Sequence, residues 1–183
     1  MFTEIEAKLK VDSTEQVEDR LRALGAEFVA EQVQSDYHFD DERGTLAEAD
    51  KCLRLRRQAA GGQEKYFLTY KGPKQKSNLK KRQEVEVEVS DGESVRKLLE
   101  LLGYTGAMVV QKKRRLWRVG NCEVALDKLD LLGEFVEIEG ADEKQIAAVQ
   151  EMLGLSDLQH IPKSYAGLIR SRLKEIARGR HKT

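Results

Sequence analysis

Apolar and polar residues alternate along much of this chain, with the two-residue period of β-strands whose two faces meet different surroundings. The alternation is clear in residues 4–9, which read Glu-Ile-Glu-Ala-Lys-Leu. Similar segments predict eight strands, at about residues 2–11, 27–39, 52–58, 65–71, 82–89, 109–118, 122–129 and 133–139. Short turn sequences such as Lys71-Gly72-Pro73 and Gly120-Asn121 indicate antiparallel pairing.

Four other segments carry apolar residues at the 3.6-residue spacing of helices. They predict helices at about residues 14–24, 91–102, 142–153 and 163–178. The clearest apolar stripes are Val17, Leu21 and Leu24 in the first, and Val95, Leu98, Leu99 and Leu102 in the second. Helix-capping signals flank these segments: Ser13 with Gln16, Ser90 with Glu93, Asp142 with Gln145, and the terminal Gly25, Gly103 and Gly154. We expect these helices to pack by one face against a sheet.

One face of the predicted sheet is densely charged. Pairs of like charge two residues apart share a strand face: Glu4 with Glu6, Glu84 with Glu86, Glu137 with Glu139, Arg54 with Arg56, and Lys112 with Arg114. A solvated face is the simplest interpretation, but such faces usually mix Thr, Ser, Gln and Lys. The helices need an apolar sheet face to cover, which leaves the charged face for the inside. We therefore predict an α+β fold, an eight-stranded antiparallel β-barrel with a charged interior and helices packed outside; closure removes exposed edges.

Length and composition limit the number of domains, the partners and the location that we expect. The 183 residues fit one domain, with a core over 1–175 and a basic tail at 176–183. Lys plus Arg and Asp plus Glu each number 32, so no net charge attracts nucleic acid or a membrane. Two widely spaced cysteines and no secretory or membrane-spanning segment indicate a cytoplasmic protein with free thiols. Neither a zinc-type histidine pattern nor a glycine-rich phosphate loop is present.

An ordered series of motifs resembles the CYTH superfamily, the triphosphate tunnel metalloenzymes. The series consists of Glu4-Ile-Glu6-Ala-Lys8, similar to the family's ExExK motif, Leu53-Arg54-Leu55-Arg56, Leu68-Thr-Tyr-Lys71-Gly-Pro73, Arg82-Gln-Glu84-Val-Glu86, Lys112-Lys-Arg114, Leu126-Asp127, Leu132-Gly-Glu-Phe-Val-Glu137-Ile-Glu139 and Ser164-Tyr165. It covers nearly the whole chain. The superfamily includes class IV adenylyl cyclases, thiamine triphosphatases and inorganic triphosphatases. The resemblance implies an eight-stranded tunnel. This agrees with the barrel predicted above, which is inverted in the sense that its charged face points inward and its apolar face outward.

The resemblance also implies roles for the charged residues. The expected triphosphate clamps are Lys8, Arg54, Arg56, Lys71, Arg82, Lys112 and Arg114, since Arg and Lys bind phosphate oxygens. The expected ligands of Mg²⁺ or Mn²⁺ are Glu4, Glu6, Glu137 and Glu139, with Asp127 and Glu84 in addition. Lys8, Glu6 and Glu137 are the expected catalytic residues. Glu86 is assigned to ion pairs with the arginines, and Lys80, Lys81, Lys113 and Arg115 to the rim or the solvent.

Three functions remain open at this point. In the first, a class IV adenylyl cyclase converts ATP to cyclic AMP and pyrophosphate; the Asp36-Tyr-His-Phe-Asp40 and Thr69-Tyr-Lys71-Gly-Pro73 blocks look closest to that branch. In the second, a phosphohydrolase acts on tripolyphosphate, thiamine triphosphate or a nucleoside triphosphate. The third, a non-catalytic binder of polyphosphate or RNA, does not need the acidic set. The expected partner is ATP or another small triphosphate, and neither nucleic acid nor a membrane is expected to bind. The sequence leaves open whether the protein forms a homodimer.

Overall fold

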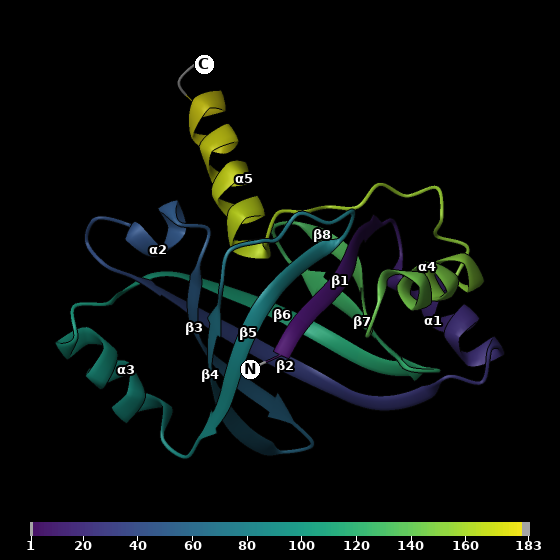
Figure 1. The fold of residues 1–183 in the computed structure, drawn as a ribbon, viewed down its shortest axis with the longest axis horizontal. Coiled ribbons are helices and arrows are strands. Elements are labelled where there is room, and N and C mark those ends of the chain that lie inside the picture. The colour runs from purple at the N-terminus through teal and green to yellow at the C-terminus, as the bar shows by residue number, and fades with distance from the viewer. Residues whose placement is uncertain (1, 181–183) are drawn as a thin grey trace.

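Eight antiparallel strands close into a barrel in the computed structural model, which describes residues 2–180 (Figure 1). The strands are β1 (Phe2–Val11), β2 (Glu27–Asp40), β3 (Cys52–Ala60), β4 (Gln63–Lys71), β5 (Lys80–Val89), β6 (Thr105–Val119), β7 (Cys122–Leu129) and β8 (Gly133–Glu139). Around the barrel their order is β1-β5-β4-β3-β2-β6-β7-β8. The predicted fold class is therefore confirmed.

In the described residues, 2–180, five helices lie outside the barrel wall or at its end. They are α1 (Thr14–Ala23), α2 (Thr45–Glu48), α3 (Gly92–Leu101), α4 (Glu143–Met152) and α5 (Tyr165–Arg180). Ser13 and Asp142 cap α1 and α4 as predicted, each accepting a hydrogen bond from the backbone three residues on. The predicted cap Ser90 is wrong, because Asp91 accepts the backbone hydrogen bonds that begin α3. The single turn of α2 was not predicted, since four residues are too few to show a period.

The main hydrophobic core lies outside the barrel, between α1, α4 and the outer faces of β1, β7 and β8. Leu9, Val124 and Ile138 point outward from their strands and are completely buried there. Leu21 of α1 and Ile146 of α4 join the same cluster. Each such side chain contributes about 1.5–3 kcal/mol when it leaves water. The apolar face is therefore the outer one, which leaves the charged face for the interior.

Helix α3 packs less completely than its apolar stripe predicts. Leu99 is buried in a cluster with Phe39 and Leu55. Leu98 and Leu102 are 56% and 64% exposed, so the helix packs on the sheet as predicted but through only part of its apolar stripe. Only a narrow side of the helix contacts the sheet. The spacing of the apolar residues alone does not show how wide that contact is.

Helix α5 projects away from the barrel, and its first turn meets the end of the barrel (Figure 1). Tyr165 and Ala166 are buried there beside Val110 and Phe135. The helix continues through residues 176–180, where a basic tail was expected, and residues 181–183 lie outside the described part of the chain. Within residues 2–180, the helices are too short or too polar for any of them to cross a membrane.

Candidate active site

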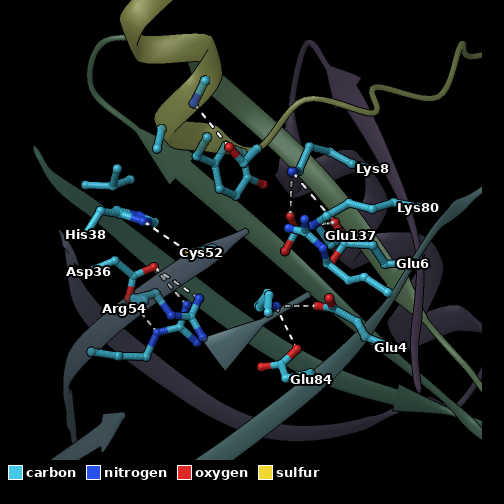
Figure 2. Close-up of a pocket in the computed structure, with 18 of the residues that line it drawn as sticks. Glu4, Glu6, Lys8, Asp36, His38, Cys52, Arg54, Lys80, Glu84 and Glu137 are labelled. Carbon is cyan, nitrogen blue, oxygen red and sulfur yellow. Dashed lines mark hydrogen bonds and ion pairs between the residues drawn. The ribbon is translucent and has the colours of Figure 1, made fainter. Parts of the chain in front are cut away.

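A cavity of about 480 Å³ runs through the barrel and is lined by charged side chains from most of its strands. Figure 2 shows Asp36 and Arg54 entering it from one wall, and Glu4, Glu6 and Lys8 from another. The predicted residues that line it are Glu4, Glu6, Lys8, Arg54, Arg56, Lys71, Arg82, Glu84, Lys112, Arg114, Glu137 and Glu139. Strand alternation therefore brings together residues from distant motifs.

Lysines form ion pairs with the buried carboxylates of β1 and β5. Lys71 Nζ lies 2.7 Å from Glu4 Oε1 and 2.7 Å from Glu84 Oε2, and all three side chains are buried. Lys80 Nζ donates to Glu6 Oε1 at 2.7 Å. The expectation that Lys80 is a rim charge is wrong, because its side chain is only 8% exposed inside the cavity. Lys80 is the first residue of β5, and the alternation was counted only from residue 82.

A second network connects β1 with β6, β7 and β8. Lys8 Nζ lies 3.2 Å from Glu137 Oε1 and 3.7 Å from Glu6 Oε1. Arg114 Nη2 lies 2.5 Å from Glu137 Oε2. Burial opposes ionisation of Glu137, but the charges of Lys8, Lys112 and Arg114 hold its pKa well below the usual range. Glu137 is therefore suited to holding cations in place.

Asp127 lies behind this network. Its carboxylate accepts two hydrogen bonds from Arg114, at 2.7 and 2.6 Å, and one from Lys112 at 3.1 Å. The hydroxyl of Tyr165 donates to it at 2.9 Å. Asp127 is fully buried and does not line the cavity. The structure thus does not support its assignment as a metal ligand, and its contacts position Lys112 and Arg114 instead.

Tyr165 lines the cavity beside this network. Its ring lies 4.2 Å from Lys8 Nζ and 5.0 Å from Lys112 Nζ, within the range of cation–π contacts. Lys8 also donates to the backbone carbonyl of Lys163 at 3.1 Å. Burial and the charge of Arg114 lower the pKa of Lys112 to about 8. The sequence showed Tyr165 only as part of a motif, since its role depends on where α5 meets the barrel.

Asp36 organises the arginines of β3, a role that the sequence did not indicate. It accepts from Arg56 at 2.6 and 2.8 Å and lies 3.5 Å from Arg54. Burial opposes the ionised form, but Arg54 and Arg56 lower the pKa of Asp36 far below its ordinary value. Arg54 also donates to Thr69 at 3.1 Å and to Glu86 at 3.3 Å. The register pairs Asp36 with Arg56 across β2 and β3, which sequence spacing cannot show.

His38 lies at the cavity wall beside Cys52, with its Nδ1 3.5 Å from the thiol sulfur (Figure 2). Burial and the positive charges of Arg54 and Arg170 lower the pKa of His38 to about 4. The imidazole is therefore neutral near pH 7. Cys52 and Cys122 are free thiols, as expected.

The remaining carboxylates supply oxygen donors of the type that a hard cation binds. Burial, followed by the charges of Glu4 and Glu6, raises the pKa of Glu139 to about 7. Glu4 Oε2 is buried and has no hydrogen-bond partner among residues 2–180. Oxygen donors of this kind suit Mg²⁺ or Mn²⁺, which would relieve the mutual repulsion. Within the described residues, no three His, Cys, Asp or Glu side chains are already gathered as a ligand set; Lys71 and Lys80 supply the positive charge instead.

The closed barrel with cationic and acidic side chains inside it defines a tunnel suited to a polyanion and its counter-ion. Comparison with protein families identifies this class: the CYTH domain matches residues 3–165. The chain therefore belongs to the CYTH family, whose members are triphosphate tunnel metalloenzymes, and the family implies an enzyme with a triphosphate substrate and a divalent metal ion.

Individual relatives agree with this assignment. The chain is 32% identical over 148 residues to a Methanocaldococcus jannaschii protein named as a candidate adenylate cyclase, covering 81% of this chain and 80% of that protein. It is 29% identical over 175 residues to adenylate cyclase CyaB of Aeromonas hydrophila, covering 90% and 87%. A Pyrococcus horikoshii protein structure matches with a TM-score of 0.81 at 27% identity, covering 92% and 99%.

A Hippeastrum protein shares the fold at 20% identity, with a TM-score of 0.73 over 92% of this chain and 95% of its own. It is described as a candidate adenylyl cyclase with a dominant triphosphatase activity.

Proposed function

We propose that this protein is a class IV adenylyl cyclase that converts ATP to cyclic AMP and pyrophosphate with the help of Mg²⁺ or Mn²⁺. The observation that carries the proposal is the cavity itself, in which cationic and carboxylate side chains converge inside a closed barrel. The similarity to CyaB over 175 residues supports the cyclase reaction among those open to the family.

The cationic side chains are arranged to bind a triphosphate. ATP carries about four negative charges near neutral pH, and phosphoryl transfer depends mainly on holding and neutralising such charge. Arg54 and Arg56 on β3 present planar donor groups, while Lys112 and Arg114 on β6 face the same cavity. Asp36 and Asp127 form ion pairs with Arg56 and Arg114 of this group. The phosphate oxygens replace part of that neutralisation when the substrate enters.

The acidic side chains are assigned to the metal. We propose Glu4, Glu6, Glu84, Glu137 and Glu139 as the set from which its ligands come. A divalent ion bound there would withdraw charge from the phosphate oxygens as a Lewis acid. Lys71 and Lys80 form ion pairs with Glu84 and Glu6 of the same set.

The reaction forms a bond between the ribose 3′ oxygen and the α-phosphorus and breaks the bond from that phosphorus to the β-phosphate oxygen. The hydroxyl proton passes to water, and pyrophosphate leaves with the bonding electrons. Lys8 is assigned to orienting the triphosphate, because Glu6 and Glu137 hold its ammonium group at the cavity wall. Arg54, Arg56 and Arg114 hold the charge of the departing pyrophosphate.

A phosphohydrolase would use the same side chains, with water attacking the terminal phosphorus. The Hippeastrum protein, described with a dominant triphosphatase activity on the same fold, makes this the alternative to separate. The test is product analysis with ATP, tripolyphosphate and thiamine triphosphate, each in Mg²⁺ and in Mn²⁺. Cyclic AMP from ATP supports the proposal. Fastest release of orthophosphate from tripolyphosphate or thiamine triphosphate, without cyclic AMP, would replace it with the hydrolase.

A further inference from the structure

Three glutamines form a hydrogen-bonded cluster in the tunnel wall that phosphate binding does not explain. Gln34 of β2 is 1% exposed and donates from Nε2 to Gln32 Oε1 at 2.7 Å and to Gln58 Oε1 at 2.9 Å. All three residues line the cavity. While Gln32 and Gln58 present their carbonyl oxygens, the two donations fix the orientation of the Gln34 amide, because rotating it alone would break both hydrogen bonds.

The cluster leaves hydrogen-bonding capacity unused. Gln34 Oε1 is buried and accepts no hydrogen bond within residues 2–180. A buried acceptor without a donor costs about 1–3 kcal/mol, so such a group points to a ligand that supplies the donor. Gln32 and Gln58 use their carbonyl oxygens as acceptors within the cluster, which leaves their amino groups as donors.

The cluster lies next to the triphosphate clamps. Gln34 is two residues from Asp36 on the same strand face, about 7 Å along the strand, and Asp36 holds Arg56. Its register partners are Gln58 on β3 and Lys112 on β6. Leu116, two residues from Arg114, supplies an apolar side chain to the same cavity. A group attached to a bound triphosphate can therefore reach the cluster.

The unpaired carbonyl indicates the chemical class of that group. Phosphate oxygens only accept hydrogen bonds at neutral pH, so they cannot satisfy Gln34 Oε1. A nitrogen heterocycle with an exocyclic amino group beside a ring nitrogen supplies both a donor and an acceptor. We propose that Gln32, Gln34 and Gln58 form the subsite for an amino-substituted heterocycle of the substrate, with Gln34 Oε1 accepting from its amino group. This inference rests on the proposed function, since the triphosphate must bind beside the cluster.

Adenine and the aminopyrimidine of thiamine share this edge, whereas hypoxanthine carries a carbonyl where adenine carries the amino group. ATP should therefore bind more tightly than inosine triphosphate, because in the same pose the latter presents a carbonyl oxygen, not an amino group, to Gln34 Oε1. Tripolyphosphate has no heterocycle and should not sense the cluster.

The test measures dissociation constants of ATP, inosine triphosphate, thiamine triphosphate and tripolyphosphate by calorimetry in EDTA, where metal-dependent turnover does not occur. The variants are Gln34→Met and Gln58→Met, which keep the side-chain length and remove the amide. Gln58 is only partly buried, so its variant serves if Gln34→Met does not fold. Gln111→Met is the matched control, because Gln111 is exposed on β6.

Each cluster variant should weaken ATP binding by about three- to tenfold, the equivalent of one hydrogen bond. ATP and inosine triphosphate should then bind alike, tripolyphosphate should shift less than about twofold, and Gln111→Met should match the wild type. The same loss seen with thiamine triphosphate instead of ATP would support the subsite and identify the heterocycle as thiamine.

Unchanged ATP and thiamine triphosphate binding in both variants would overturn the inference and leave the triphosphate enzyme intact. An equal loss for tripolyphosphate would also overturn it, because the cluster would then act on the phosphates or on the fold. If the wild type bound none of the four ligands, either in EDTA or with Mg²⁺ present, the proposed function itself would fail.

Discussion

Replacing Lys71 by methionine should destabilise the protein strongly, because one ammonium group neutralises two buried carboxylates. Lys71 Nζ lies 2.7 Å from both Glu4 and Glu84, and the side chains of the two glutamates are each 6% exposed. Removing one partner of a buried ion pair costs about 3–5 kcal/mol. For a protein of this size, that loss corresponds to about 6–20 °C in Tm.

The loss should also depend on pH. Without Lys71, two buried carboxylates lie close together with no cation between them, and both burial and mutual repulsion disfavour their ionised forms. A penalty on ionised carboxylates that exists only in the folded state lowers stability where they are ionised, and protonation at lower pH removes it. The difference in unfolding free energy between Lys71→Met and the wild type should therefore be larger at pH 8 than at pH 5.

The assay is urea and thermal unfolding followed by circular dichroism at both pH values. Lys65→Met is the matched control on the same strand, since Lys65 pairs with Glu88 at 3.1 Å with both side chains about half exposed. That pair should contribute less than about 1 kcal/mol at either pH. Equal losses of stability in the two variants at both pH values would show that Lys71 does not neutralise a buried pair of carboxylates.

Three further predictions concern the cavity. Glu6→Gln and Glu137→Gln should reduce turnover of ATP by at least about 100-fold while circular dichroism shows an intact fold; full activity in both would contradict their assignment. The His38 imidazole should titrate near pH 4 by NMR, against 6.5 for the unfolded chain, so that its contribution to stability declines as pH falls from about 6.5 towards 4; a pKa above 6 would show that it is not buried beside the arginines. Mn²⁺ affinity should fall as pH drops below about 7, because Glu139 takes up a proton, and calorimetry on Glu139→Gln should show weaker binding with a smaller pH dependence; an unchanged pH profile would remove Glu139 from the metal set.

The barrel and its inverted orientation were predictable because the period of two is a local property of each strand. Glu4, Glu6 and Lys8 had to share a face, and the apolar residues between them needed the helices. The width of a helix contact is not local in this sense. Leu98 and Leu102 belong to the same apolar stripe as Leu99. They are exposed because of the way α3 packs on β3, which the spacing of apolar residues does not show.

The site was predictable as a set of residues but not as a set of partners. Which carboxylate meets which cation depends on the register between strands, as in the pairing of Asp36 with Arg56. Asp127 was assigned to the metal from its motif, yet Lys112, Arg114 and Tyr165 surround it behind the cavity wall. Lys80 continues the alternation of Arg82 and Glu84, but it lies outside the strand predicted from residue 82.

A ³¹P NMR time course of ATP with the purified protein and Mg²⁺ tests the cyclase reaction most directly. We expect ATP to disappear as cyclic AMP and pyrophosphate appear in equal amounts. Appearance of ADP and orthophosphate, with no cyclic AMP resonance, would contradict it.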